Sequence, residues 1–308
     1  MRVLITGGAG FIGSALANQL IQDGRHVRVL DDLSVGERAY LHPNIHFTRG
    51  DVSDKPKLWG LLNKVDCVYH LAARVSVSES ILYPREYNAT NVGGTVALME
   101  AMRDAGVQRV VLGSSAAIYG EQAQSPVTEN LPPHPTSPYG VSKLSAEHYV
   151  SSIGQLWGIE TVILRVFNTY GPGQALPPTH PPVIPQFIQQ ALGGGSVMVY
   201  GDGAQIRDFV YIEDVVRGLV EAGTARNVNQ RIFNIGSGEG SSINRLVKAI
   251  ETVTGRDLHP LSVSTESGGV SRLIADISLA KELLNYQPQV SLTQGLRFLL
   301  ERDPRFVV

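Results

Sequence analysis

The chain has 308 residues, of which 43% are hydrophobic, and its 26 Lys or Arg and 28 Asp or Glu residues give a formal net charge of −2. Because this balance provides no chain-wide basic field, neither nucleic acid nor a membrane surface is expected as a partner. The length suits a cofactor domain of roughly 150 residues followed by a second lobe. No apolar run approaches the roughly 18 residues of a membrane span, and strand-like residues begin at position 3, so we expect a cytoplasmic protein without a secretory leader.

The first informative segment is Gly7-Gly8-Ala9-Gly10-Phe11-Ile12-Gly13, which follows an apolar run at residues 3–6 and opens a helical pattern. Glycines at positions 7, 10 and 13 supply a tight turn, a close backbone approach and a close contact between helix and strand. The free N–H groups at the start of the helix then attract a pyrophosphate. This segment predicts dinucleotide binding.

Asp31 and Asp32 end the next predicted strand, residues 27–31, and Asp31 lies 18 residues after Gly13. An acidic side chain about 20 residues after the glycines reaches the adenosine ribose in dinucleotide-binding folds. Its carboxylate would repel a 2′-phosphate, so we expect NAD rather than NADP. The alternative is an aspartate that only caps a helix or closes a turn.

Short β-branched runs recur at residues 3–6, 27–31, 45–48, 67–72, 110–115 and 161–166. Their spacing leaves room for a helix between each pair, which predicts an α/β fold with a doubly wound parallel sheet of the Rossmann type. Past Arg165 the pattern breaks at Gly171-Pro172-Gly173 and a proline-rich segment. We therefore expect an NAD-binding domain over 1–166 and a smaller α/β substrate lobe over 167–308, with some segments crossing back. The single cysteine, Cys67, is expected in the core.

Tyr139 and Lys143 lie one helical turn apart, directly after Pro138, a residue that suits the first turn of a helix. A nearby positive charge lowers the pKa of a phenol, so Lys143 and the charge of the cofactor would make Tyr139 a general base. The strand 110–115 ends at Ser115, whose hydroxyl is expected to bond the reacting oxygen, while Ser114 is expected to bond the backbone. Alternatively, both serines simply finish the strand.

Seven segments together resemble the extended short-chain dehydrogenase/reductase family. They are Thr6–Gly13, Asp51-Val52, His70–Ala73, Asn91–Thr95, Ser114-Ser115, Tyr139 with Lys143, and Arg165–Asn168. Within that family the chain is most similar to nucleotide-sugar epimerases and dehydratases, above all those that interconvert UDP-glucose and UDP-galactose. The resemblance implies that NAD oxidises C4 of the sugar transiently, that the 4-keto sugar turns over, and that hydride returns to its other face.

The resemblance, with the patterns above, assigns site residues. Catalytic roles are expected for Tyr139, Lys143 and Ser115, and no metal is expected. Cofactor contacts are expected at Gly7, Gly10, Phe11, Ile12, Gly13, Asp31, Asp32, Asp51, Val52, Leu71, Ala72, Ala73, Asn91, Tyr139 and Lys143. Substrate contacts, to what we expect is a UDP-hexose, are expected at Ser115, Asn168, Val183, Tyr200, Arg207 and Arg272. A homodimer through the helix bearing Tyr139 is also implied, and Asn91 is implied to support that helix.

Two departures from the family pattern bear on the substrate. Related epimerases usually carry Arg-x-Gly-Asp where this chain reads Glu266-Ser267-Gly268-Gly269. Arg272 is the candidate replacement for the missing arginine, unless the site accepts a different nucleotide. Leu273 falls where family members control the space for an N-acetyl group, and its bulk favours unacetylated hexoses.

Three other functions compete with epimerisation. A dehydratase needs an acid and a base, but Ala116-Ala117 stand where family dehydratases usually carry Asp-Glu. A UDP-glucuronate decarboxylase needs a cation at the sugar carboxylate, for which Arg74 or Arg272 would serve. A non-catalytic protein that senses NAD is the third, and the intact set of Ser115, Tyr139 and Lys143 argues against it.

Overall fold

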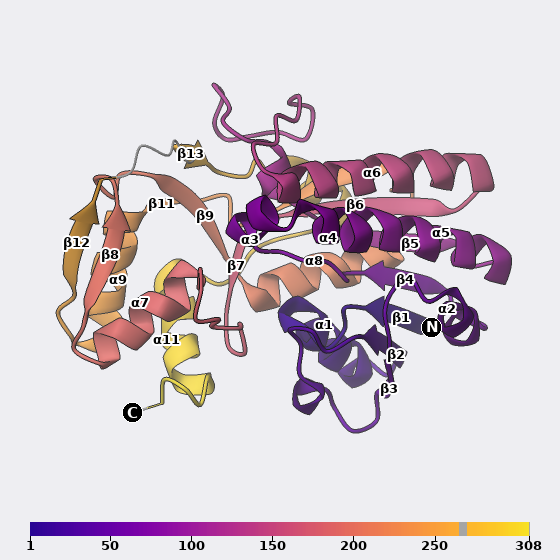
Figure 1. Ribbon diagram of the computed structural model, residues 1–308, viewed down its shortest axis with the longest axis horizontal. Helices are drawn as coiled ribbons and strands as arrows, with labels where there is room; N and C mark the ends of the chain where they lie inside the picture. The colour runs from indigo at the N-terminus through magenta and orange to yellow at the C-terminus, as the bar shows by residue number, and fades with distance from the viewer. Residues whose placement is uncertain (265–269, 308) are drawn as a thin grey trace.

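Within residues 1–264 and 270–307, which the computed structural model describes, the largest element is a seven-stranded parallel sheet of order β10-β6-β5-β4-β1-β2-β3 (Figure 1). Its strands are β1 Arg2–Thr6, β2 His26–Asp31, β3 His46–Arg49, β4 Cys67–His70, β5 Arg109–Ser115, β6 Glu160–Val166 and β10 Arg231–Ile235. The predicted doubly wound fold is confirmed. The strand order reverses between β1 and β4, and ligands of such sheets bind at that point, outside the carboxyl ends of the strands.

Side-chain alternation along each strand divides the core into two layers. On β1, Val3 and Ile5 pack with Leu16, whereas Leu4 between them packs with Leu98. Both faces are therefore apolar, as a parallel sheet covered by helices requires. One face carries α1 Phe11–Gln22 and α8 Ile212–Thr224, and the other carries α2 Lys55–Leu62, α5 Gly94–Ala105 and α6 Pro138–Trp157.

The second lobe lies beyond the end of β6 and contains two small sheets. One joins β7 Asn168–Tyr170, β9 Ile206–Tyr211, β11 Gly240–Ser242 and β13 Arg272–Leu273, and the other pairs β8 Ser196–Tyr200 with β12 His259–Val263. Its helices are α7 Val183–Leu192, α9 Ile243–Thr254, α10 Ser278–Leu284 and α11 Leu292–Arg302. β10 returns from this part of the chain to pair with β6, and α8 packs on the main sheet. The domain boundary between residues 166 and 167 stays a prediction.

Short helical segments connect β4 to α5 and follow β2 and β5. They are α3 Val77–Leu82, α4 Pro84–Tyr87, a π turn η2 at Asn88–Gly93, and two 3-10 turns, η1 Arg38–Tyr40 and η3 Ala116–Ile118. Cys67 on β4 is fully buried, which confirms its predicted place in the core. In the part of the chain that the structure describes, no helix combines the length and apolar character of a membrane span.

We predict opposite stability changes for two helical glycines. A Cβ at Gly223 of α8 would overlap the hydroxyl of the buried Tyr69, whereas a Cβ at Gly60 of α2 would meet no atom within 4 Å. Gly223→Ala should therefore lower the free energy of unfolding by about 1–3 kcal/mol. Gly60→Ala should raise it by about 0.5–1 kcal/mol, because alanine has the better helix propensity. Urea unfolding of both variants measures the difference, and equal effects would contradict the packing described here.

Candidate active site

The glycine loop between β1 and α1 forms one wall of the site. Gly7 has φ +69°, and a Cβ there would lie 2.6 Å from the Ala72 backbone nitrogen, while a Cβ at Gly13 would overlap the Gly7 carbonyl oxygen. These two glycines are required by the protein's own backbone. Gly10 is different, because its nearest neighbour would be the Gly7 oxygen at 3.3 Å. The missing side chain at Gly10 leaves space in front of the loop for a ligand.

The first turn of α1 fits an anionic group. Its N-cap is Gly10, which offers no side-chain acceptor, and the first turn holds no acidic residue. Phe11 and Ile12 begin the helix and are half-buried. The N–H groups of this turn thus remain available to a phosphate, whose charge the helix dipole also favours.

Asp31 lies at the end of β2, beside this loop. One carboxylate oxygen accepts from Ala9 N at 2.9 Å and the other accepts from Leu33 N at 2.8 Å. The carboxylate therefore closes a turn and also lies at the glycine loop, so both interpretations of its role hold together. Each oxygen keeps a free lone pair for a ribose hydroxyl. Asp32 is exposed and accepts from Ser34 N at 2.8 Å.

The other predicted cofactor residues surround the ends of β3 and β4. Asp51 is exposed and accepts from Ser53 N at 2.7 Å, while Val52 is buried against Gly94 of α5. Leu71, Ala72 and Ala73 follow β4 and are half-buried. The Leu71 amide donates to Thr6 O at 3.0 Å. This bond holds the segment after β4 against the end of β1.

Tyr139 and Lys143 lie in the first two turns of α6, and Ser115 ends β5. The helix starts at Ser137, whose side chain accepts from Gly140 N at 3.1 Å, with Pro138 in the first turn. Tyr139 and Lys143 are both buried. The Ser115 Oγ accepts from Ala117 N at 3.1 Å and keeps its own proton to donate.

The expected lowering of the Tyr139 pKa by Lys143 is not found. Burial raises the pKa of the phenol above its ordinary value, and the hydrogen bond with Ser115 acts in the opposite direction. Lys143 instead donates from Nζ to Gly113 O at 2.5 Å. Burial lowers the pKa of Lys143 to about 8, although the carboxylate of Glu147 raises it. Among the protein's own groups, Ser115 is therefore the one that favours the phenolate.

Ser114 does not bond the backbone as predicted. Its Oγ donates to the Glu147 carboxylate on α6, and the same carboxylate pairs with Arg165 of β6 at 2.8 Å. Arg165 also donates to Tyr119 OH at 3.0 Å, and both members of the pair are buried. Glu147 was not among the residues predicted from the sequence. The signal that would have found it is its place one turn after Lys143 on the same helix face.

Asn91 lies in the π turn between α4 and α5 and bonds two other segments. Its side chain accepts from Arg74 N at 2.8 Å and donates to Arg74 O at 3.0 Å. The same amide nitrogen donates at 2.9 Å to Ser142 Oγ, which donates to Tyr139 O at 2.8 Å. Asn91 thus lies in direct hydrogen-bond contact with the helix that carries Tyr139.

Arg74 is one of the two candidates for the cation that a decarboxylase would need beside the sugar carboxylate. It pairs with Glu79 at 3.6 Å and lies over the Tyr87 ring at 6.0 Å. Tyr87 in turn meets Tyr139 edge-on, with ring centroids 6.4 Å apart. The charge of Arg74 is therefore already balanced by Glu79.

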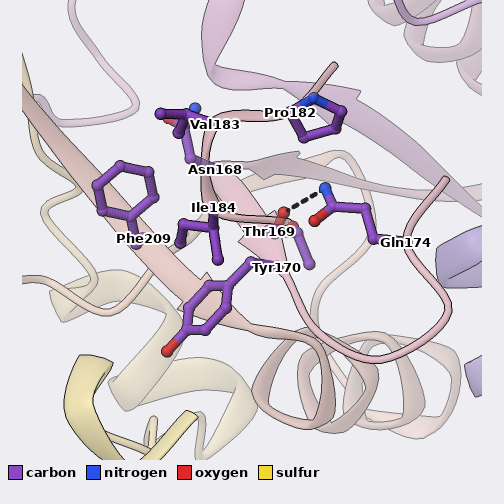
Figure 2. A pocket seen from close by; sticks show the side chains of 8 residues that line it. All are labelled: Asn168, Thr169, Tyr170, Gln174, Pro182, Val183, Ile184 and Phe209. Carbon is purple, nitrogen blue, oxygen red and sulfur yellow. Dashed lines mark hydrogen bonds between the residues drawn. The ribbon is translucent and has the colours of Figure 1, made fainter. Parts of the chain in front are cut away.

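Two predicted substrate residues, Asn168 and Val183, line one pocket of the second lobe. Figure 2 shows this pocket, which is lined by Asn168, Thr169, Tyr170, Gln174, Pro182, Val183, Ile184 and Phe209. The Gln174 side chain donates to Thr169 O at 3.0 Å. Phe209 lies two residues after Arg207 on β9, so this strand carries both a residue of the pocket and the predicted phosphate-binding arginine.

Arg207 and Arg272 lie on neighbouring strands but on opposite faces. Arg207 is half-buried on β9 and is paired in register with Leu273 of β13, whereas Arg272 is paired with Ile206. Paired residues share a face and consecutive residues alternate, so Arg272 points away from the face of Arg207. This register argues against Arg272 as the replacement for a phosphate-binding arginine. Glu266-Ser267-Gly268-Gly269 lie outside the described residues.

The second-lobe residues differ in how firmly they are held. Asp208, next to Arg207, is fully buried and accepts from Ser237 N at 2.7 Å, Gly238 N at 3.0 Å and Ala275 N at 3.1 Å. Sequence reasoning missed this anchor, although an aspartate inside a strand of apolar residues was a signal for it. Tyr200, at the end of β8, is 56% exposed.

Comparison with known proteins identifies relatives across the whole chain. A model of the NAD dependent epimerase/dehydratase family matches residues 3–236. The UDP-glucose 4-epimerase of Mycolicibacterium smegmatis is 38% identical and covers 98% of each chain.

Solved structures agree in fold. The UDP-glucose 4-epimerase of Thermotoga maritima, solved with UDP-glucose, matches with a TM-score of 0.93 and 37% identity over 98% of each chain. A UDP-glucuronic acid 4-epimerase from Bacillus cereus, solved with UDP-glucuronic acid and NAD, matches with a TM-score of 0.89 and 35% identity over 98% of each chain. The chain belongs to the NAD dependent epimerase/dehydratase family.

Proposed function

We propose that the chain is an NAD-dependent nucleotide-sugar 4-epimerase that acts on a UDP-hexose. The observation that carries this proposal is the buried Tyr139 phenol, close to Ser115 at the carboxyl end of β5, in a family whose cofactor is NAD. The glycine loop, the uncapped start of α1 and Asp31 fit that cofactor. The proposed reaction inverts C4 without net oxidation.

Each residue of the proposed site has a task that its surroundings support. NAD, when bound, supplies the acceptor for the C4 hydride, the same hydride for return, and a positive charge that favours the phenolate. Tyr139 takes the proton of the sugar 4-hydroxyl and later returns it. Without substrate the single Ser115 hydroxyl proton favours the phenolate; when the sugar is bound, that proton turns to the sugar 4-oxygen and fixes it beside the phenol. Lys143, whose pKa burial lowers to about 8, donates to the Gly113 carbonyl near the end of β5.

The sugar must present its two faces in turn, while the nucleotide end stays bound. We assign the diphosphate to Arg207, because a half-buried guanidinium without a carboxylate partner among the described residues suits a bidentate phosphate contact. We assign the neighbouring part of the substrate to Asn168 and Val183, which line the same pocket of the second lobe. Rotation of the 4-keto sugar about its link to the diphosphate changes the face that receives hydride.

The hexose itself is proposed from relatives that bind UDP-glucose and UDP-glucuronic acid. We favour a neutral UDP-hexose, since Glu79 already neutralises Arg74 beside Tyr87. Separate incubation with UDP-glucose, UDP-N-acetylglucosamine and UDP-glucuronate, followed by chromatography of the products, tests this. A C4 epimer of UDP-glucose is expected. Release of carbon dioxide would identify a decarboxylase, a dehydrated 4-keto product would identify a dehydratase, and retention of NAD without turnover would identify a sensing protein.

Tyr139→Phe should lower kcat by about 10²- to 10⁴-fold, because it removes the proposed general base and leaves the ring in place. The bound NAD should be retained, as measured by absorbance after acid release. Tyr149→Phe is the matched control, since Tyr149 is an exposed tyrosine of the same helix. Turnover that survives Tyr139→Phe undiminished would contradict the proposed catalytic role.

Arg207→Ala should raise KM for the nucleotide sugar by about 10- to 100-fold, the loss of a charge-assisted contact to phosphate. Arg207→Lys should restore only part of the affinity, because an ammonium cannot bind bidentately. Arg256→Ala, at an exposed turn after α9, is the control. Steady-state kinetics gives kcat and KM for each variant. An unchanged KM in Arg207→Ala would contradict the proposal that Arg207 binds the diphosphate.

We also infer a homodimer through α6 and its neighbour α3. Large hydrophobic side chains are exposed on both helices, which pack against each other: Val77, Ile81 and Leu82 on α3, and Val141 and Tyr149 on α6. Large apolar side chains exposed on two packed helices are typical of an interaction surface. A second copy of the chain is the occupant that the family resemblance implies.

Tyr149→Asp should convert the dimer to a monomer, because it places a charge in the apolar patch at the interface. Sedimentation equilibrium measures the mass of each form. Trp59→Asp provides the control, since Trp59 is a similarly exposed aromatic residue on α2. A wild-type chain that sediments as a monomer would exclude the proposed dimer.

A further inference from the structure

His70, the last residue of β4, is a buried polar side chain that the proposed reaction does not use. It is 2% exposed and lies between two threonines. Its Nδ1 is 2.7 Å from Thr6 Oγ1 at the end of β1, and its Nε2 is 2.8 Å from Thr95 Oγ1 on α5. The imidazole thus connects the strand before the glycine loop to the helix after the π turn.

For a neutral imidazole, the donors and acceptors of this chain of bonds have one consistent assignment. Thr95 Oγ1 gives its single proton to Asn91 O at 2.6 Å, so it accepts from His70 Nε2. Thr6 Oγ1 accepts from Ala72 N at 3.4 Å and gives its proton to His70 Nδ1. A neutral ring in this position therefore carries its proton on Nε2. Burial and the charge of Lys143 agree, because they lower the pKa of His70 to about 3.

The same chain of bonds continues to Tyr139. Asn91, whose carbonyl accepts from Thr95, donates from its side chain to Ser142 Oγ at 2.9 Å. Ser142 donates to the backbone carbonyl of Tyr139 at 2.8 Å. Hydrogen bonds and one short stretch of backbone thereby connect the glycine loop to the first turn of α6. These are the two elements whose relative position decides whether the phenol and the cofactor meet.

We propose that His70 is a positioning residue for Tyr139. Its neutral ring, protonated on Nε2, bonds Thr6 and Thr95 and thereby fixes the π turn relative to the glycine loop. The π turn in turn fixes the first turn of α6. The proposal rests on the proposed function, because it concerns the same reaction. It differs from a packing role, since a side chain of similar size without both ring nitrogens would leave Thr6 and Thr95 unbridged. Its effect appears in kcat and depends on the Tyr139 hydroxyl.

The bonding assignment can be tested without any activity. Nitrogen chemical shifts of the wild-type protein labelled with ¹⁵N-histidine should show His70 with a protonated Nε2 and a bare Nδ1, unchanged between pH 5 and pH 8. Thr95→Val should shift Nε2 alone. A ring that titrates in this range, or that carries its proton on Nδ1, overturns the proposal. The outcome of this test does not depend on whether the protein has epimerase activity.

Kinetics then separates positioning from general support. Replacing His70 itself endangers folding, so the test uses Thr95→Val, which removes the hydroxyl that accepts from His70 and donates to Asn91 O. It should lower kcat by about 10-fold with KM within about 2-fold, since a small displacement of a reacting group is costly. Thr161→Val is the control, because the Thr161 hydroxyl is buried without a partner in the described residues and its removal should leave kcat unchanged.

The decisive comparison repeats Thr95→Val in the Tyr139→Phe background. If His70 acts through the phenol, the residual kcat of Tyr139→Phe should not fall further, because the group being positioned is already absent. An equal 10-fold loss in both backgrounds would show a general structural role and overturn the proposal. An unchanged kcat in Thr95→Val alone would do the same. Absence of turnover in the wild type, with the expected nitrogen shifts, would instead refute the proposed function.

Discussion

The placement of the first turn of α6 is the constraint on which the site depends. Tyr139 belongs to a helix on one face of the sheet, while the glycine loop continues into α1 on the opposite face. Three contacts fix the helix from different sides: Lys143 to Gly113 on β5, Glu147 to Arg165 on β6, and Ser142 to Asn91 in the π turn. Because each contact reaches a different element, the helix can neither slide along the sheet nor rotate without breaking one of them.

The Glu147–Arg165 pair carries a cost that its surroundings offset. Two charges taken out of water need excellent geometry and further hydrogen bonds before the pair becomes favourable. Here Ser114 donates to the carboxylate, and the guanidinium also donates to Tyr119 OH at 3.0 Å and to Glu129 O at 3.0 Å. Removing one partner would leave a buried charge unpaired, at a cost of about 3–5 kcal/mol. The main effect of the pair is therefore to fix the position of α6, and its net contribution to stability is small.

Local sequence patterns predicted the main sheet well, because a short run of β-branched residues is a local property of each buried strand. Five of the six predicted strand runs start within one residue of β1, β2, β3, β5 and β6, and the sixth starts with β4 at Cys67. β10 was missed as the seventh strand because it comes after a long non-repeating segment. Its place beside β6 is a pairing between distant parts of the sequence, which no local signal specifies.

Side-chain partners within the site were harder to predict than the residues themselves. The spacing of Tyr139 and Lys143 correctly places both on one buried stretch of helix, but it does not say which atom the ammonium bonds. Gly113 O is that atom, 30 residues away in sequence. The same limit applies to Arg272, which is near Arg207 in register but on the other face. Strand register is a tertiary property, and a single sequence with one short strand does not specify it.

Buried carboxylates replace regular pairing where the second lobe is irregular. Asp208 accepts from three backbone amides on two loops, Asp214 accepts from Gln289 N at 2.7 Å and Val290 N at 3.1 Å, and Asp303 accepts from Gly173 N at 3.0 Å. Loops that lack a strand partner would otherwise leave these N–H groups unsatisfied in the interior. Asp303 holds the turn after β7, and Asp208 holds the segments on either side of Arg207's strand. The proposed substrate residues thereby gain fixed positions on a part of the chain with little regular sheet, which a rotating 4-keto sugar needs if its nucleotide end is to stay still.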